Sequence, residues 1–245
     1  MNRQTKIPMK HATTFSYLLL MLLLLTVTGN AFASSTWYVN GVSGRDGNTC
    51  KSPATACKTI GHAIALASSG DSIMVAAATY TENLTIGISL KVLGAGTSTT
   101  ILDGGGAGTV VTIPTSTSVV LSSMTIRNGQ AVDGGGVYNS GNLTITSTTI
   151  SGNSASGTPT SGPGGGGIYN VGTLTISNST VSGNVATPGR MCSNPYYSRC
   201  RRSGSGGGIY NGATLTIDKS TVSGNVANDV CFLSHYYGPH IVCFG

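Results

Sequence analysis

The chain has 245 residues, of which 36 are glycine, and it carries 13 lysine and arginine residues against seven aspartate and glutamate residues. Its formal net charge is +6 at pH 7, but three of the 13 cations stand within the first ten residues, so ten cations face seven anions in the rest of the chain. This small and scattered excess argues against a nucleic-acid-binding protein, which needs a concentrated basic face.

The first 33 residues have the pattern of an export signal. Arg3, Lys6 and Lys10 make a basic start, and an apolar run at 18–27 is followed by the small-residue site Ala-Phe-Ala that ends at Ala33. The run is too short for a transmembrane helix. We therefore predict a signal peptide over 1–33, a mature chain without a transmembrane span, and a secreted or surface location.

Residues 34–70 are predicted to form an N-terminal cap. Trp37-Tyr-Val39 indicates a short strand. The stretch 58–68 places Ile60, Ala63, Ile64 and Ala67 on one face of a short helix. A solenoid needs such a cover because its first turn would otherwise expose the core and strand edges.

Residues 71–227 consist of short β-forming runs that glycine, asparagine, serine and threonine interrupt. Within them a 22-residue unit occurs three times, as GGGVYNSGNLTITSTTISGNSA at 134–155, GGGIYNVGTLTISNSTVSGNVA at 165–186 and GGGIYNGATLTIDKSTVSGNVA at 206–227. The last two copies agree at 18 of 22 positions. Repetition at this period is typical of a solenoid, in which each unit buries its apolar face against its neighbours.

Each unit supplies three short strands with inward aliphatic side chains. In the first copy, Leu143 and Ile145 alternate with threonine, Val137 gives a second inward position and Ile150 a third. This pattern predicts an all-β, three-faced parallel β-helix. About six or seven coils would fit into 71–227.

The polar positions of the unit predict further ladders. Asn153 and its equivalents Asn184 and Asn225 follow Ser-Gly and are expected to bond up and down the stack at a bend. The glycine triplets indicate a tight corner with unusual backbone angles. Tyr138, Tyr169 and Tyr210 alternate with inward residues and should form an outward aromatic ladder, which stacking between coils explains without a ligand.

Six cysteines form three close pairs, for which we expect local disulfides outside the cytosol: Cys50 and Cys57, Cys192 and Cys200, and Cys231 and Cys243. A zinc site is the weaker interpretation, because no histidine or second cysteine pair lies at ligand spacing along the chain. The last pair bounds an irregular segment at 228–245, which could close the final coil or be the end of a truncated chain.

Variable segments interrupt the repeats between each closing asparagine and the next glycine triplet. Because they leave equivalent points of successive coils, they should stack along one edge, where insertions often form a binding face. The candidate binding residues are Tyr196, Tyr197, Arg199, Arg201, Arg202, Tyr236 and Tyr237. The alternative is surface decoration that keeps a glycine-rich protein soluble.

The opening of the mature chain carries a family resemblance. Trp37-Tyr-Val-Asn, Cys57-Lys-Thr-Ile, Gly70-Asp-Ser-Ile and Ala78-Thr-Tyr-Thr-Glu-Asn resemble the opening segment of bacterial right-handed parallel β-helix proteins of the pectin-lyase-like superfamily. The repeats are similar to those of its surface proteins, including polymorphic-outer-membrane-like proteins. The resemblance implies a right-handed β-helix at the bacterial cell envelope.

That superfamily includes lyases, hydrolases and esterases that act on uronate polysaccharides, so the acidic residues decide whether catalysis is expected. A hydrolase needs converging carboxylates and a calcium-dependent lyase needs clustered ones with a basic residue, but each acid here stands alone in its run. The best constellation joins Arg127 to Asp133 and Asp103, although both aspartates precede glycine as turn residues do. Tyr80-x-Glu82 resembles a pectin-esterase fragment and is interpreted as part of the fold.

The sequence thus favours an exported, non-catalytic surface protein that displays edge loops for adhesion or glycan binding. The alternatives are a uronate lyase or esterase and a structural protein of the cell envelope. No cofactor and no metal are expected, and the partner is an extracellular polysaccharide or protein.

Overall fold

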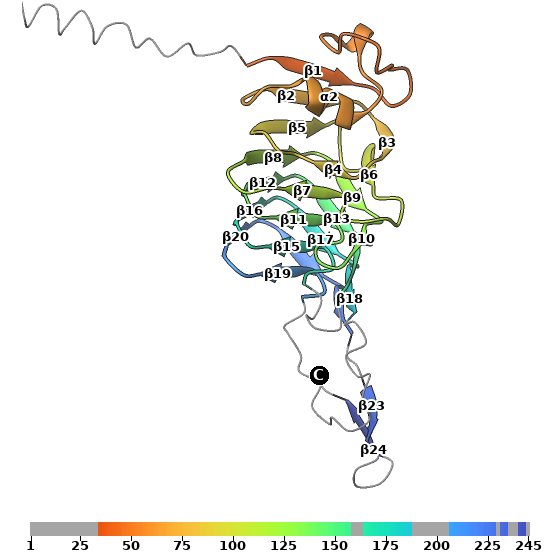
Figure 1. Cartoon of the computed structure of the whole chain (residues 1–245), viewed down its shortest axis with the longest axis vertical. Coiled ribbons are helices and arrows are strands. Elements are labelled where there is room, and N and C mark those ends of the chain that lie inside the picture. The colour runs from red at the N-terminus through yellow and green to blue at the C-terminus, as the bar shows by residue number, and fades with distance from the viewer. Residues whose placement is uncertain (1–33, 158–163, 188–205, 229–230, 235–239, 244–245) are drawn as a thin grey trace, which may run out of the picture. The chain divides into compact units, whose positions relative to one another are not determined.

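The strands of residues 34–228 belong to four parallel sheets, which the chain visits in turn (Figure 1). The computed structural model describes residues 34–157, 164–187 and 206–228, together with two strands of the C-terminal segment. A coil passes through a seven-stranded sheet (sheet 1), a six-stranded sheet (sheet 2), a four-stranded sheet (sheet 3) and a five-stranded sheet (sheet 4). The predicted right-handed parallel β-helix is confirmed.

The sheets contain the following strands. Sheet 1 consists of β1 (Thr36–Val39), β2 (Ser72–Val75), β5 (Leu90–Gly94), β8 (Ser118–Ser122), β12 (Asn142–Thr146), β16 (Thr173–Ser177) and β20 (Thr214–Asp218). Sheet 2 consists of β3 (Ala78–Thr81), β6 (Thr100–Asp103), β9 (Thr125–Arg127), β13 (Thr149–Ser151), β17 (Thr180–Ser182) and β21 (Thr221–Ser223). Sheet 3 consists of β10 (Gln130–Ala131), β14 (Ser154–Ser156), β18 (Val185–Thr187) and β22 (Val226–Ala227). Sheet 4 consists of β4 (Leu84–Thr85), β7 (Val111–Ile113), β11 (Val137–Asn139), β15 (Ile168–Asn170) and β19 (Ile209–Asn211).

Sheets 1, 2 and 4 are the three predicted faces, whereas sheet 3 was not predicted. Its strands have two or three residues each and follow the asparagine that turns the chain, as at Asn153. They begin only with β10, so the first coils lack them. Runs as short as Ser-Ala-Ser or Val-Ala-Thr have no alternation from which a strand could be inferred.

The core consists of aliphatic rows, since equivalent residues of successive coils pair in register. Leu143 and Ile145 pair with Leu174 and Ile176, and all four side chains are fully buried. The rows continue on sheets 2 and 4 through Ile150 and its equivalents and Val137 and its equivalents. The one-to-one register follows from the period-two alternation, because a shift by one residue would expose every aliphatic side chain.

Asparagine ladders run along the inside of two corners. Asn153 donates to the Asn184 Oδ1 from its backbone N at 3.0 Å and from its Nδ2 at 2.9 Å, and Asn184 repeats both bonds to Asn225 at 3.1 and 2.9 Å. This is the predicted ladder. A second one, not predicted, joins Asn139 to Asn170 at 2.7 Å and Asn170 to Asn211 at 2.6 Å. The sequence feature that could have predicted this second ladder is the alternation of side chains in Val-Tyr-Asn, in which valine and asparagine point inward and tyrosine points outward.

The glycine triplets meet two different requirements. The first glycine has a positive φ in the first two triplets, +59° at Gly134 and +51° at Gly165, which fits the predicted corner. The second has no room for a side chain, because a Cβ on Gly166 would overlap the carbonyl oxygens of Val185 and Gly207. The predicted backbone angles therefore explain only some of the glycines in the triplets. The others are required because neighbouring backbones approach each other closely.

The first coil is covered by η1 (Pro53–Thr55) and α2 (Ile60–Leu66). Ile60 and Ala63 are buried, and Ile64 and Ala67 pack against the core from partly buried positions, as the helical pattern predicts. Glu82 accepts the free N–H groups of Ile60 at 2.9 Å and Gly61 at 2.8 Å, which fixes the start of α2 to the first coil. Glu82 is thus part of the fold, as expected.

The C-terminal segment contains an antiparallel hairpin of β23 (Cys231–Ser234) and β24 (His240–Cys243). Cys231 and Cys243 are register partners at its base. Their predicted pairing is therefore compatible with the backbone.

Candidate binding edge

The insertions leave the β-helix from stacked positions. The first follows β14 and the second follows β18, and the last residues of these strands, Ser156 and Thr187, are register partners. The chain returns at the glycine triplets, where Gly134 N donates to Gly164 O at 2.9 Å and Gly166 N donates to Gly206 O at 3.0 Å. Both ends of each insertion therefore lie on one edge of the solenoid, as the sequence predicts.

A tyrosine ladder follows the returning stems on sheet 4. The rings of Tyr138 and Tyr169 stack with centroids 5.1 Å apart, and those of Tyr169 and Tyr210 stack at 4.9 Å with an interplanar angle of 5°. Gly164 must be glycine, because a Cβ there would overlap the ring of Tyr169. We call the stems Ser154–Ser156, Val185–Thr187, Gly164–Gly167 and Gly206–Gly208, with the three tyrosines, the loop edge.

The tyrosines of the loop edge present hydroxyl groups in a row. Because their faces stack on one another, the rims and phenolic oxygens remain for outside contacts. Burial raises the pKa of Tyr169, and the Asp133 carboxylate and the neighbouring tyrosines raise it further. Tyr169 is therefore a neutral donor and acceptor at physiological pH.

The predicted catalytic candidates do not come together as one group. Arg127 Nε donates to Asp103 Oδ2 at 2.9 Å across the register pair of β6 and β9. Asp103 Oδ1 accepts from Asn128 Nδ2 at 2.8 Å and from Gly105 N at 3.0 Å. Burial raises the pKa of Asp103, but these bonds and the Arg127 charge outweigh it and lower the pKa below its usual value. Asp133 Oδ1 instead accepts from Gly164 N at 2.8 Å, at the loop edge.

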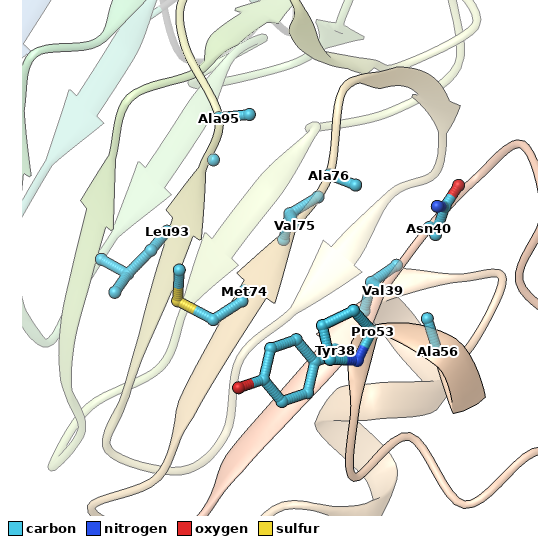
Figure 2. Close-up of a pocket in the computed structure, with 11 residues that line it drawn as sticks. Tyr38, Val39, Asn40, Pro53, Ala56, Met74, Val75, Ala76, Leu93 and Ala95 are labelled. Atoms are coloured by element: carbon cyan, nitrogen blue, oxygen red, sulfur yellow. The ribbon is translucent and has the colours of Figure 1, made fainter.

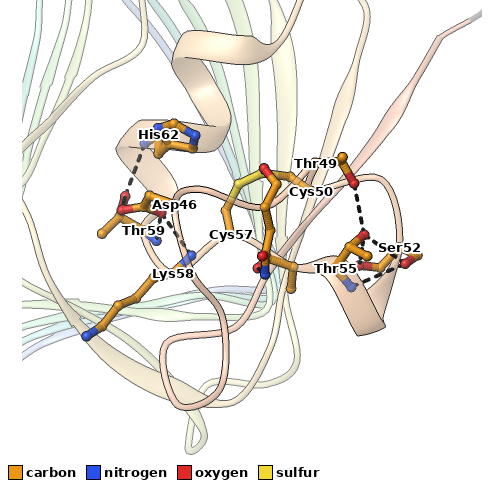
Figure 3. The surroundings of a disulfide bond; sticks show 11 residues. Asp46, Thr49, Cys50, Ser52, Thr55, Cys57, Lys58, Thr59 and His62 are labelled. Atoms are coloured by element: carbon orange, nitrogen blue, oxygen red, sulfur yellow. Dashed lines mark hydrogen bonds between the residues drawn. A yellow bond between two sulfur atoms is a disulfide. The ribbon is translucent and has the colours of Figure 1, made fainter.

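The remaining described carboxylates also bond to nearby groups of the protein. Asp71 accepts from Trp37 Nε1 at 2.8 Å, Ser68 N at 2.9 Å and Ser35 N at 2.7 Å. Asp46 accepts from the backbone of Lys58 and Thr59 ahead of α2 (Figure 3). Asp218 lies 3.9 Å from the ammonium group of Lys219 on the exposed surface.

Cys50 and Cys57 form the predicted disulfide under the cap (Figure 3). One expectation requires correction, since His62 follows Cys57 by only five residues and lies close to this pair. The possible ligand atoms of Cys50, Cys57 and His62 are within 4.8 Å of one another. The turn into α2 brings the histidine there, and the sulfur atoms are bonded to each other.

An apolar groove of about 280 Å³ lies on the outer face of sheet 1 and was not predicted (Figure 2). Tyr38, Met74 and Leu93 form one row across β1, β2 and β5, and Pro53 of η1 stands beside them. The sequence feature that could have predicted the groove is the outward position of these three apolar residues on their strands. Among the residues that the structure describes, the groove has no cluster of polar side chains that would orient a ligand.

Several predicted residues lie outside the described residues. These are the signal peptide 1–33, the pair Cys192 and Cys200, and all the candidate binding residues, namely Tyr196, Tyr197, Arg199, Arg201, Arg202, Tyr236 and Tyr237. The described part of the loop edge therefore consists of the stems of the insertions and the tyrosine ladder.

Comparisons with known proteins find similarity in structure. No protein-family model matches the chain, and no curated protein matches it. Among solved structures, the pectin methylesterase PemA from Erwinia chrysanthemi is similar with 18% identity and a TM-score of 0.46, over 63% of this chain and 52% of that one. The pectin methylesterase from Aspergillus niger has 19% identity and a TM-score of 0.46, over 80% and 57%. A pectin methylesterase in complex with a hexasaccharide has 17% identity and a TM-score of 0.43, over 77% and 66%.

The chain thus spans about half to two thirds of the length of these proteins. Their identity to it is below 20% and their TM-scores are below 0.5. The all-parallel pairing and the register of the coils establish the same fold independently. The chain is a right-handed parallel β-helix, as its sequence predicts.

Proposed function

We propose that this protein is an exported, non-catalytic β-helix protein of the cell surface that binds an extracellular glycan along the loop edge. The observation that carries the proposal is the coincidence of two features on one edge. The stems of both insertions stack there, and the tyrosine ladder follows the returning stems from coil to coil.

The tyrosine ladder has the chemistry that a glycan requires. Phenol rings combine apolar area with a hydroxyl group that both donates and accepts, as sugar rings do. The centroid spacings of 5.1 and 4.9 Å repeat this pattern along the stack, which suits an extended ligand. The insertion between β18 and the third glycine triplet contains Tyr196, Tyr197 and four arginines in its sequence, and arginine pairs with the carboxylate of a uronate.

The carboxylates support a non-catalytic role. Cleavage of a glycosidic bond by a hydrolase needs two carboxyl groups on either side of that bond. Among the residues that the structure describes, Asp46, Asp71 and Glu82 hold the cap, and Asp103 is paired with Arg127. Asp133 bonds to a backbone N–H of the returning stem.

Export rests on the sequence of residues 1–33. A basic start, an apolar run and a small-residue site are the features of a cleaved signal peptide. Over the described part of the chain, the structure has no helix that is long and apolar enough to cross a membrane.

The test is a glycan-array screen of the mature protein, residues 34–245, with uronate degradation assayed in the same samples. We expect selective binding without product release. Replacing Tyr138, Tyr169 and Tyr210 by Phe keeps the stacked rings and removes the hydroxyl row, so binding should weaken by roughly tenfold or more. Replacing Tyr196, Tyr197, Tyr236 and Tyr237 by Ala tests the loops separately.

The matched control is Tyr38→Phe, which removes a phenolic hydroxyl on sheet 1 away from the loop edge. Binding that is equally weak in this control would place the glycan elsewhere. Product release that survives all the tyrosine variants would overturn the non-catalytic role and direct the search to Arg127, Asp133 and Asp103. A protein that binds no glycan would leave a protein ligand as the next candidate.

A further inference from the structure

The last described coil exposes aliphatic side chains that every earlier coil buries. Ile217 on β20 is 43% exposed and Val222 on β21 is 47% exposed. Their register partners in the preceding coil, Ile176 and Val181, are 0% and 1% exposed. The residues of the last coil that are equivalent to core residues thus form an apolar surface at the end of the β-helix. We call this surface, formed by β19 to β22, the end face.

The end face is also an open strand edge. The strands β20, β21, β22 and β19 are the last members of sheets 1 to 4. Their outer backbone groups have no further strand among the residues that the structure describes, and Asn225 is the last rung of its ladder. Open edges of this kind favour association, so folded proteins usually cover them.

At the other end of the β-helix, a loop bounded by two cysteines covers the edge. Cys50 O accepts from Tyr38 N at 2.8 Å, and Cys57 N donates to Tyr38 O at 2.9 Å, so the loop occupies the outer edge of β1. α2 covers the aliphatic side chains behind it. The first coil of this chain is therefore covered by a cysteine-bounded loop and a helix, whereas the end face has no such cover among the described residues.

The hairpin β23–β24 follows the end face directly in the chain. Only residues 228–230 separate β22 from β23. The hairpin is bounded by Cys231 and Cys243, and its register pairs Phe232 with Val242 and Leu233 with Ile241. An isolated two-stranded hairpin is marginally stable in water, so one with this apolar composition needs a surface to pack on.

We infer that the end face is a docking surface whose occupant is the hairpin β23–β24. Each of the two elements lacks what the other provides. The end face needs apolar cover, and the hairpin needs a core. Residues 228–245 contain no further glycine triplet, so this segment does not itself repeat the 22-residue unit.

Hydrogen exchange of the mature protein, followed by mass spectrometry, tests the docking from both sides. In the hairpin variant Leu233→Ser with Ile241→Ser, we expect amide protection in β20 to β22 to fall by roughly tenfold or more. In the coil variant Val222→Ser, we expect protection of the hairpin amides to fall. The matched control is Thr221→Ser, the neighbouring residue on the outer face of β21.

Two results would overturn the inference. One is a hairpin variant that leaves exchange in β20 to β22 unchanged together with Val222→Ser that leaves exchange in the hairpin unchanged. The other is protection of β20 to β22 that depends on protein concentration, with a doubled mass in light scattering, because the occupant would then be a second copy. Loss of protection in the control as well would assign the effect to the coil itself and also contradict the docking.

Discussion

Single carboxylates hold the cap to the first coil. Glu82 reaches two free N–H groups of α2, Asp46 accepts from the residues just before it, and Asp71 bonds to Trp37. A helix of seven residues is too short to be stable alone, so these contacts and the buried Ile60 decide whether it forms. At this scale, acidic residues stabilise the fold.

Removing the Glu82 carboxylate should destabilise the cap. Glu82→Ala leaves the N–H groups of Ile60 and Gly61 without their partner, and we expect the free energy of unfolding to fall by about 1–3 kcal/mol. Urea unfolding of the mature protein measures it. The matched control Asp218→Ala removes an exposed carboxylate with a weak ion pair and should change the same quantity by less than about 0.5 kcal/mol. Equal effects would contradict the role of Glu82.

Asp71 should make stability depend on acidic pH. Burial raises the pKa of its carboxyl, but the hydrogen bonds from Ser68, Trp37 and Ser35, together with Lys51, outweigh it, so the pKa lies below the usual value of 3.8. Because the folded-state pKa is the lower one, Asp71 contributes stability above pH 3.8 that is lost as the pH falls through the folded-state value. The free energy of unfolding of Asp71→Asn should change less with pH between pH 5 and the acid limb than that of the wild type. An unchanged slope would show that other acids dominate.

Ladders and glycine corners determine how one coil stacks on the next. Gly166 has no space for a Cβ, and Asn153, Asn184 and Asn225 satisfy backbone groups that sit inside the coil at the bend between sheets 2 and 3. Buried polar groups are costly when unpaired, so these elements specify both the corner and the spacing between coils. The aliphatic rows exclude a shift of the register by one residue. The ladders and the glycine corners add a second, more specific constraint on how the strands align.

The central rung of the ladder should be the most sensitive to substitution. Asn184→Ala removes the acceptor for Asn153 and the donor to Ile150 O and Asn225, which leaves buried groups unpaired. We expect a loss of about 2–4 kcal/mol in the free energy of unfolding. Asn142→Ala, at the exposed start of β12, is the control and should cost below about 0.5 kcal/mol. A similar loss in both variants would mean that the ladder bonds contribute little.

The two insertions between sheets 3 and 4 differ in length, but the coils around them stack in the same way. The Asn153–Asn184 and Asn184–Asn225 rungs have the same Nδ2 to Oδ1 distance of 2.9 Å, although 31 residues separate the first pair and 41 the second. The extra ten residues lie in the insertion that follows β18. The coils therefore stack identically whatever the length of the segment between sheets 3 and 4.

Exchanging one insertion for the other should leave the fold intact. A variant in which residues 188–205 are replaced by the sequence of the equivalent segment 157–164 is ten residues shorter and keeps every strand and every rung. Because loop-closure entropy varies slowly with length, we expect the free energy of unfolding to change by about 1 kcal/mol or less. Circular dichroism during urea unfolding measures it. Loss of cooperative unfolding would show that the longer insertion belongs to the folded core.

The repeated unit allowed most of the β-helix to be predicted. Leu143, Ile145 and Ile150 alternate with polar residues in every copy, and strict alternation fixes which side chains are buried. The ladder at Asn139 was missed although the predicted outward position of Tyr138 already implies an inward position for the next residue. His62 and the cysteines were missed as a cluster although His62 follows Cys57 by only five residues. The loop edge could be predicted in place but not in its contacts, since Ser156 and Thr187 meet only through the register of sheet 3.

The constancy of the asparagine rungs separates the structural requirements of the stack from those of the insertions. The whole segment after β14 or β18 could be replaced in evolution, and selection for the binding function that we propose would then act on the loops alone, while the stack stayed under structural constraint. New specificity would arise here by swapping or lengthening a single segment, without the compensating core changes that a compact enzyme needs when its site is rebuilt.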